Sequence, residues 1–126
     1  MWIEYNENPI GIRTGDCAVR AISLAIGVDW ETAYDLITEA GRQMGMMPST
    51  NAVWGAVLRQ NGFYRNAIPN LCPDCYSAED FCYDHPDGVF VLCFDRHVAT
   101  VIDGDIYDAW DSSKEIPMYY WFLKER

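Results

Sequence analysis

The spacing of apolar residues along the chain predicts helices in its first part. Up to residue 62, apolar side chains recur every three or four positions, which is the period of an amphipathic helix. Residues 1–15, 42–48 and 63–76 lack this spacing and are predicted to be extended or irregular connections. Capping residues and breakers predict helices from Asp16 to Gly27, from Asp29 to Gly41, from Ser49 or Thr50 to Asn61-Gly62, and a short one from Ser77 to His85-Pro86.

Beyond Gly88 the pattern is that of β-strands. Val89 to Phe94 is a continuous apolar run with the length of a buried strand, and Asp103-Gly104 favours a tight hairpin turn. Helices followed by antiparallel strands, with no repeat and no linker, indicate one α+β domain over residues 1–126. The further strands are predicted over His97 to Ile102, Ile106 to Trp110 and Met118 to Leu123.

The predicted hairpin turn also sets which residues face each other. A two-residue turn places Ile102 opposite Asp105. Side chains on one face of a strand recur with period two, so His97 and Asp108 become diagonal neighbours on one face, and Asp111 falls on the other. A carboxylate beside an imidazole fixes its tautomer and favours its charged form, as catalysis requires. An ordinary surface pair of histidine and aspartate is the alternative interpretation.

Cys17 lies at the opening turn of the first predicted helix, directly after Asp16. At that place, free backbone N–H groups and the helix dipole favour a thiolate, which is the nucleophilic form of cysteine. The same N–H groups can stabilise a developing oxyanion. A packing role is the alternative, since buried cysteines are often inert. If Cys17 has an imidazole partner, His97 is the better candidate, because His85 precedes a proline at a helix end.

The chain has 126 residues with a net charge of −10, from 9 basic and 19 acidic side chains. Such a surface repels DNA and RNA, so nucleic-acid binding is not expected. No apolar run approaches the roughly 18–20 residues of a membrane-spanning helix, and the first residues lack the pattern of a secretion signal. We therefore expect a cytoplasmic protein that does not bind membranes.

The five cysteines are an odd number, and without a secretion signal they are expected to be reduced. Cys72, Cys75, Cys82 and His85 form the pattern C-x2-C-x6-C-x2-H, whose four ligands could hold a structural zinc ion. Alternatively, Cys82 packs in the core, His85 ends a helix, and the first two cysteines form a redox dithiol. Cys93 lies inside an apolar strand and is expected to pack in the core.

Two sequence blocks stand far apart in the chain and carry a resemblance to a known family. The first is Gly15-Asp16-Cys17-Ala18-Val19-Arg20-Ala21. The second runs from His97-Val98-Ala99-Thr100-Val101-Ile102-Asp103-Gly104 to Tyr107-Asp108-Ala109-Trp110-Asp111. Together with the flanks Tyr5-Asn6-Glu7-Asn8-Pro9 and residues 80–88, they resemble papain-like cysteine peptidases, in particular the small single-domain group of phages and of bacteria that carry prophages.

The resemblance implies a papain-like fold and hydrolysis of an amide or isopeptide bond in a protein or peptide substrate, with no cofactor required. Cys17 would be the nucleophile, His97 the base that takes its proton, and Asp108 the residue that orients His97. Another acyl-transfer activity is possible on the same scaffold. The alternative is a non-enzymatic papain-like binding module, with or without a zinc ion, that blocks a host protein.

The chain departs from the family pattern at the oxyanion hole. Many papain-like enzymes carry a glutamine shortly before the nucleophile, where this chain has Gly11. Asn6 and Asn8 are the candidates for this donor, with the backbone N–H of Cys17 as the second donor. Arg20, one turn after Cys17, is expected either to pair with a carboxylate or to support the thiolate.

Overall fold

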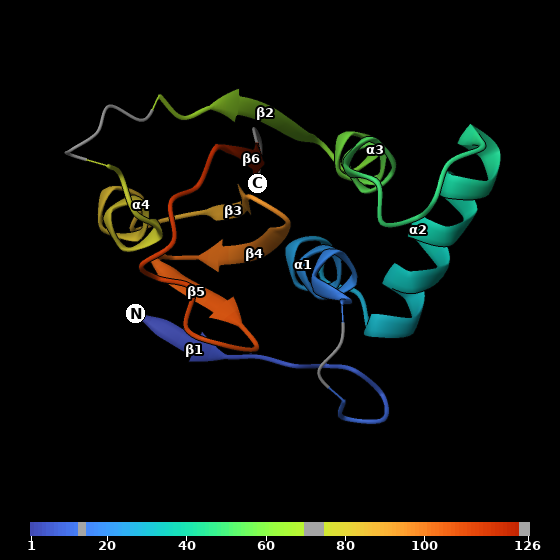
Figure 1. The fold of residues 1–126 in the computed structure, drawn as a ribbon, viewed down its shortest axis with the longest axis horizontal. Coiled ribbons are helices and arrows are strands. Elements are labelled where there is room, and N and C mark those ends of the chain that lie inside the picture. The colour runs from blue at the N-terminus through green and yellow to red at the C-terminus, as the bar shows by residue number, and fades with distance from the viewer. Residues whose placement is uncertain (13–14, 70–74, 124–126) are drawn as a thin grey trace.

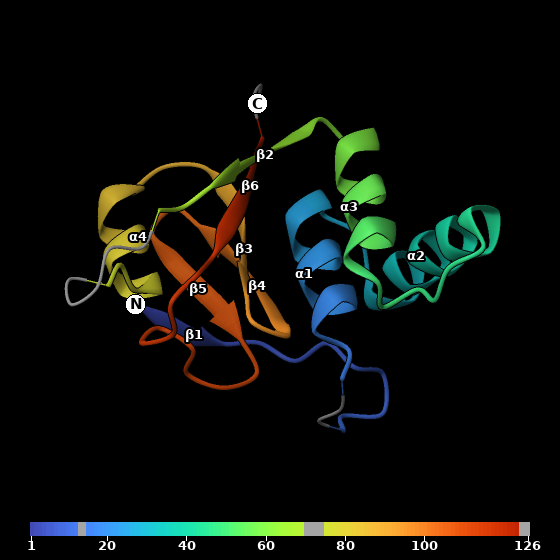
Figure 2. The same cartoon turned by 45° about the horizontal axis from the view of Figure 1, so that its top comes forward.

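The computed structural model describes residues 1–12, 15–69 and 75–123. These residues form a six-stranded sheet with helices packed on both faces, which confirms the α+β class (Figure 1). Helices α1, α2 and α3 lie together at one side of the sheet and α4 at the other, as Figure 2 also shows. Within the described ranges, none of the helices is both long and apolar enough to cross a membrane.

The helices begin and end close to the positions that their capping residues predict. The carboxylate of Asp29 accepts a hydrogen bond of 2.7 Å from the N–H of Thr32 at the start of α2. Ser77 and Asp80 form a reciprocal capping box at the start of α4. Gly27 ends α1 in the left-handed conformation. The helices are α1 (Cys17–Ile26), α2 (Trp30–Met44), α3 (Asn51–Gln60) and α4 (Ala78–Asp84).

Helix α2 extends beyond its predicted end at Gly41. It ends at Met44, and Gly45 follows with a φ of 68°, which is the left-handed conformation. Gly41 is buried, and a Cβ atom at this position would lie only 2.8 Å from the carbonyl oxygen of Met46. This glycine therefore allows the loop after the helix to approach closely, and it does not end the helix.

The sheet is mixed, which corrects the expectation of a purely antiparallel one. The first strand, β1, lies at one edge and runs parallel to β5, and β2 lies at the other edge. Strand β1 lies in the segment that the sequence predicts to be an extended lead-in, and β2 lies in one predicted to be irregular. Neither is predicted as a strand, because each is short and buries too few side chains to give an alternating pattern. In spatial order the strands are β1 (Trp2–Glu4), β5 (Asp105–Asp108), β4 (His97–Ile102), β3 (Val89–Phe94), β6 (Tyr119–Leu123) and β2 (Phe63–Ala67).

Strands β4 and β5 form the predicted two-residue hairpin. Ile102 faces Asp105, as the sequence register requires. Both turn residues have positive φ angles, 49° for Asp103 and 82° for Gly104, which is the conformation of a type I′ turn. Strand β5 ends at Asp108, earlier than predicted, so that the chain leaves the sheet directly after this residue.

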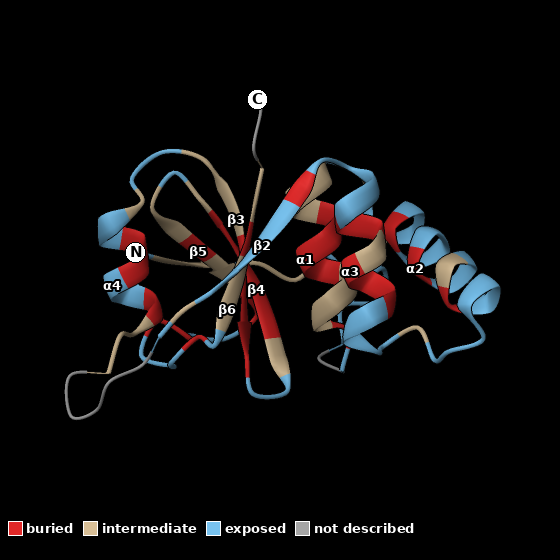
Figure 3. Cartoon of the chain, turned by 90° about the horizontal axis from the view of Figure 1, so that it is seen from above, coloured by how far each residue is buried: buried red, intermediate tan, exposed pale blue. Residues whose placement is uncertain are grey.

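Each face of the sheet carries its own hydrophobic core, and neighbouring residues of β3 belong to opposite cores. Figure 3 shows buried residues, in red, on α1 and α3 at one side of the sheet and on α4 at the other. Val91 and Cys93 belong to the larger core, with the side chains of α1, α2 and α3. Leu92 and Phe94 belong to the smaller core, with the side chains of α4. Cys93 is 1% exposed, which confirms its predicted place in the core.

Helix α1 lies directly against β4. The hydroxyl Oγ1 of Thr100, in the middle of β4, donates a hydrogen bond of 2.8 Å to the carbonyl oxygen of Ala21 in α1. Both residues are buried, so this bond lies away from water, where a hydrogen bond competes least with solvent. The contact fixes the position of α1 along β4 and therefore brings the start of the helix, at Cys17, to the start of the strand, at His97.

Candidate active site

Cys17 is the first residue of α1 and is half-buried. The side chain of the N-cap residue, Asp16, makes no capping hydrogen bond, so it does not block the first-turn N–H groups of the helix. Cys17 lines a cavity of about 220 Å³, which we call the Cys17 cleft. This cleft lies between the start of α1, the start of α3 and the β3–β4 turn. Its lining includes Gly15, Cys17, Ser49, Asn51, Trp54, Arg96 and His97.

His97 and Asp108 are in direct contact, as the hairpin register predicts. The Nε2 atom of His97 lies 2.6 Å from Oδ2 of Asp108 in a hydrogen bond. Asp111 lies elsewhere and is exposed, and its carboxylate accepts a hydrogen bond from the N–H of Ser113. Cys17 and His97 line the same two hollows and lie close enough to shift each other's pKa, and Nδ1 is the ring nitrogen of His97 that is not bonded to Asp108. The structure thus brings Cys17, His97 and Asp108 together.

The surroundings shift the pKa values of Cys17 and His97 in opposite directions. Burial raises the pKa of the Cys17 thiol, but hydrogen bonds with His97 and with the backbone of Val98 outweigh it, so that the pKa lies below the ordinary 9.0. Burial lowers the pKa of His97, but the hydrogen bonds with Asp108 and Cys17 raise it to about 9. Together these shifts favour a thiolate beside an imidazolium near neutral pH.

Several further hydrogen bonds hold Asp108, which is 2% exposed. The hydroxyl of Ser112 donates to Oδ2 over 2.6 Å, and the N–H of Ala109 donates to Oδ1 over 2.8 Å. A buried carboxylate needs such partners because it has lost its water. The bonds also fix the direction in which Asp108 faces His97. Sequence reasoning misses Ser112, because a serine just after a strand is an ordinary turn residue.

Arg20 connects Asp108 to the start of α1. Its guanidinium forms a buried ion pair with Asp16, and it lies 3.4 Å from Oδ1 of Asp108. The positive charge of Arg20 also contributes to the lowered pKa of Cys17. Arg20 therefore serves both purposes that the sequence leaves open, pairing with carboxylates and supporting the thiolate.

Two aromatic rings lie against the imidazole of His97. The centroid of the Trp110 ring is 4.9 Å from that of His97, and the Phe94 ring is 5.8 Å away. Trp110 is 42% exposed and lines a second hollow of about 290 Å³ together with Cys17 and His97. The apolar rings limit the access of water to the imidazole, which strengthens its hydrogen bond with Asp108.

The structure does not bring the two oxyanion-hole candidates to the thiol. The side-chain amide of Asn6 donates to the carbonyl oxygen of Ile12 over 3.3 Å, and that of Asn8 donates to Asp16 over 3.3 Å. Neither asparagine belongs to the described residues that line the two hollows at Cys17. The backbone N–H of Cys17 lies at the start of the helix and is the oxyanion-hole donor that remains at the site.

The structure describes three of the four predicted zinc ligands, Cys75, Cys82 and His85. Cys72 lies outside the described residues, and Cys75 is disulfide-bonded, which corrects the expectation of reduced thiols throughout. A cysteine in a disulfide has no thiolate to offer to zinc. Cys82 is buried in the smaller core, and Nδ1 of His85 lies 2.9 Å from the carbonyl oxygen of Phe81. In the part of the chain that is described, no three His, Cys, Asp or Glu side chains are grouped to hold a metal ion, and the zinc site stays a prediction.

The arrangement around Cys17 suits nucleophilic chemistry on a carbonyl group. It combines a thiol of lowered pKa, a histidine in contact with it, and a buried carboxylate that orients the histidine. Comparison of the chain with protein-family models, curated proteins and solved structures gives no match. The chemistry of these side chains is therefore the basis on which a function can be argued.

Proposed function

We propose that the chain is a small papain-like cysteine peptidase, of phage or prophage origin, that hydrolyses an amide or isopeptide bond in a protein or peptide. The observation that carries the proposal is the interaction of Cys17 with His97, whose Nε2 atom is hydrogen-bonded to Asp108. Helix dipole, imidazolium and Arg20 all favour the thiolate of Cys17. A cysteine that serves only packing has no need of a charged histidine and a buried carboxylate.

In the proposed reaction, the Cys17 thiolate attacks the carbonyl carbon, and the electron pair of the C=O bond moves to oxygen. The N–H of Cys17 stabilises that oxyanion. When the tetrahedral intermediate collapses, the C–N bond breaks, and His97 gives its proton to the leaving amine. Neutral His97 then takes a proton from water, whose oxygen attacks the thioester and releases the acid and the thiolate.

Selective alkylation of Cys17 tests the proposal without knowledge of the substrate. We expect iodoacetamide to modify Cys17 with a pH midpoint below 9.0, the ordinary pKa of a cysteine thiol. Peptide mapping by mass spectrometry assigns the modified residue, and rates over pH 5–10 give the midpoint. His97→Ala should raise the midpoint to the ordinary value or above, because the thiolate then loses its charged partner.

Cys82→Ser is the matched control, since it removes a free thiol from the smaller core and leaves the rate at Cys17 unchanged. Hydrolysis itself is tested by incubating the protein with a peptide library and sequencing new amino termini, with Cys17→Ser as the inactive variant. An ordinary midpoint for Cys17 that is insensitive to His97→Ala would contradict the proposal. It would favour a binding module instead.

A further inference from the structure

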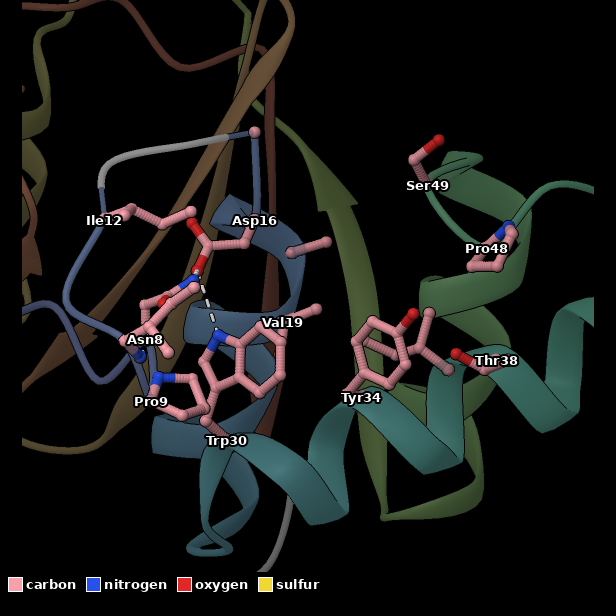
Figure 4. Close-up of a pocket in the computed structure, with 14 residues that line it drawn as sticks. Asn8, Pro9, Ile12, Asp16, Val19, Trp30, Tyr34, Thr38, Pro48 and Ser49 are labelled. Carbon is pink, nitrogen blue, oxygen red and sulfur yellow. Dashed lines mark hydrogen bonds between the residues drawn. The ribbon is translucent and has the colours of Figure 1, made fainter.

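A large cavity lies beside the Cys17 cleft, between α1, α2 and residues 8–12 and 15–16. Its volume is about 570 Å³, which is within the range of small-molecule binding pockets. We call it the α2 pocket. Trp30 and Tyr34 project into it from α2, with their rings stacked 5.2 Å apart, and Pro48 closes the opposite end (Figure 4). Val19 of α1 lines another wall, and the buried side chain of Ile37 adds a further apolar surface.

The most polar group of the α2 pocket is already occupied by hydrogen bonds within the protein. The carboxylate of Asp16 accepts a hydrogen bond of 2.9 Å from Nε1 of Trp30 (Figure 4) and one of 3.3 Å from Asn8. It also pairs with Arg20. The indole is therefore held by its polar edge, and its apolar face is left for the cavity. Such a pocket favours an apolar group over a charged or hydrogen-bonding one.

Apolar side chains also gather at the mouth of the α2 pocket. Ile10, Ile12 and Tyr34 line the cavity and are 77%, 50% and 49% exposed. Large apolar side chains that stay exposed together around a cavity mark a binding surface more often than isolated ones do.

The α2 pocket adjoins the Cys17 cleft. Gly15, Ala18 and Ser49 line both hollows, and two of these residues are within two positions of Cys17 in the chain. Gly15 has no side chain, and the space that a Cβ atom would enter is open to a distance of 4 Å. An extended substrate in the cleft can thus pass over Gly15 and place a neighbouring side chain in the α2 pocket.

We infer that the α2 pocket binds a bulky apolar side chain, aromatic or branched aliphatic, of a peptide substrate whose scissile bond lies at Cys17. The inference rests on the proposed function and specifies its substrate. The stacked rings of Trp30 and Tyr34 provide a flat apolar wall, and the volume of the pocket accepts the largest natural side chains.

Matched covalent inhibitors test the inference. We would measure inactivation by acetyl-dipeptidyl chloromethyl ketones that carry Phe or Ala at one position and Gly at the other, in both orders. A benzyl group buries about 100 Å² more apolar surface than a methyl group, so in one order the Phe compound should alkylate Cys17 at least about tenfold faster. The rate with iodoacetamide, which is too small to need the pocket, is measured in parallel.

Two substitutions in the α2 pocket complete the test. Thr38 is an exposed residue of α2 that lines the cavity, and Thr38→Trp should fill the pocket. The ratio of the inactivation rates of the Phe and Ala compounds, called here the Phe/Ala ratio, should then fall toward one. Tyr34→Ala removes half of the aromatic wall and should lower the ratio severalfold. Tyr83→Ala is the matched control, because Tyr83 is 86% exposed on α4 at the other side of the sheet, and the ratio should stay unchanged.

The two proposals fail in different ways. A Phe/Ala ratio near one in both orders, with fast iodoacetamide labelling of Cys17, overturns the pocket assignment and leaves the proposed function in place. A high ratio that neither pocket variant reduces also overturns the assignment. Slow iodoacetamide labelling with an ordinary pH midpoint overturns the proposed function instead.

Discussion

At the scale of single residues, Asp108 acts on Cys17 through the imidazole between them. Its hydrogen bond with His97 helps to raise the pKa of the imidazole to about 9, against the opposing effect of burial. The imidazole in turn lowers the pKa of Cys17 through a hydrogen bond and through its charge. One buried carboxylate therefore affects the charge of a thiol that it does not touch.

Asp108→Asn should make Cys17 less reactive at neutral pH. The amide keeps the size of the side chain and removes its charge, so the pKa of His97 falls below about 9 and the pKa of Cys17 rises. We expect the midpoint of iodoacetamide labelling to rise by about one pH unit, which lowers the rate at pH 7 about tenfold. Asp111→Asn is the matched control and should leave the midpoint unchanged, since Asp111 is exposed and bonds to Ser113.

The pH dependence of hydrolysis follows from the same two groups. In the parent protein, hydrolysis should rise as the pH passes the lowered pKa of Cys17, because the thiolate forms. It should fall again above about pH 9, because His97 then loses the proton that the leaving amine needs. Alkylation needs only the thiolate and should not fall at high pH. An Asp108→Asn protein with unaltered profiles would show that the carboxylate has no such influence.

The sequence predicts the contact of His97 with Asp108, because hairpin register depends on a turn whose residues are recognisable. It does not predict the hydrogen bond from Ser112, nor that the carboxylates paired with Arg20 are those of Asp16 and Asp108. These contacts depend on the path of the chain after β5 and on the rotation of α1, and neither has a periodic sequence pattern. The positions of Asn6 and Asn8 are likewise set by an irregular segment.

At the scale of secondary-structure elements, the site depends on how α1 is seated on β4. Cys17 and His97 belong to different elements, and the hydrogen bond from Thr100 to Ala21 joins these elements about one helical turn away from the thiol. A shift of α1 along β4 would separate the thiol from the imidazole, and small displacements of reacting groups reduce catalysis strongly.

Thr100→Val should weaken the contact between α1 and β4. Valine keeps the shape of threonine and removes the hydroxyl group, so a buried hydrogen bond is lost. We expect the free energy of unfolding to fall by about 1–2 kcal/mol, measured by urea denaturation. Thr100→Ser is the matched variant: it keeps the hydroxyl and should retain more of the Cys17 labelling rate than Thr100→Val does. Equal labelling rates in the two variants would mean that this bond does not position α1.

Secondary-structure elements with a strong local sequence pattern are predicted, whereas the two edge strands of the sheet are not. Helix starts and the hairpin have local signals, whereas β1 and β2 are recognisable only from their neighbours in the sheet. The parallel pairing of β1 with β5 joins segments that are far apart in the sequence, and no local pattern reports it. In the sequence, Gly41 is taken as the end of a helix. The glycine is required instead by the close approach of a loop, which is a tertiary contact.

At the scale of the whole molecule, a net charge of −10 repels anionic substrates from most of the surface. Arg96, which follows β3 at the hairpin to β4, is exposed and lines both hollows at Cys17. A cation at this place offsets the repulsion locally. The overall charge is read from composition, but the position of Arg96 beside Cys17 follows from the fold.

Arg96→Gln should slow the labelling of Cys17 by anionic iodoacetate more than by neutral iodoacetamide. Removing one exposed charge near the thiol should reduce the iodoacetate/iodoacetamide ratio about threefold at low ionic strength, and by less in 1 M salt, because salt screens exposed charges. Arg59→Gln removes the same charge on α3 and is the control, since Arg59 lines a different hollow. A ratio that is the same in both variants would show that Arg96 has no local effect.

The order of the elements along the chain has a consequence for biosynthesis. Cys17 is made well before His97, Asp108 and Ser112, which follow it by 80 or more positions in the chain. Until His97 and Asp108 are made, the nascent chain therefore carries Cys17 as an ordinary thiol, with neither the histidine nor the carboxylate that lower its pKa. A ribosome adds about 5–20 residues per second, so this interval lasts at least roughly 4–16 seconds. Under the proposed function, an unfinished chain has no means of attacking the proteins around it.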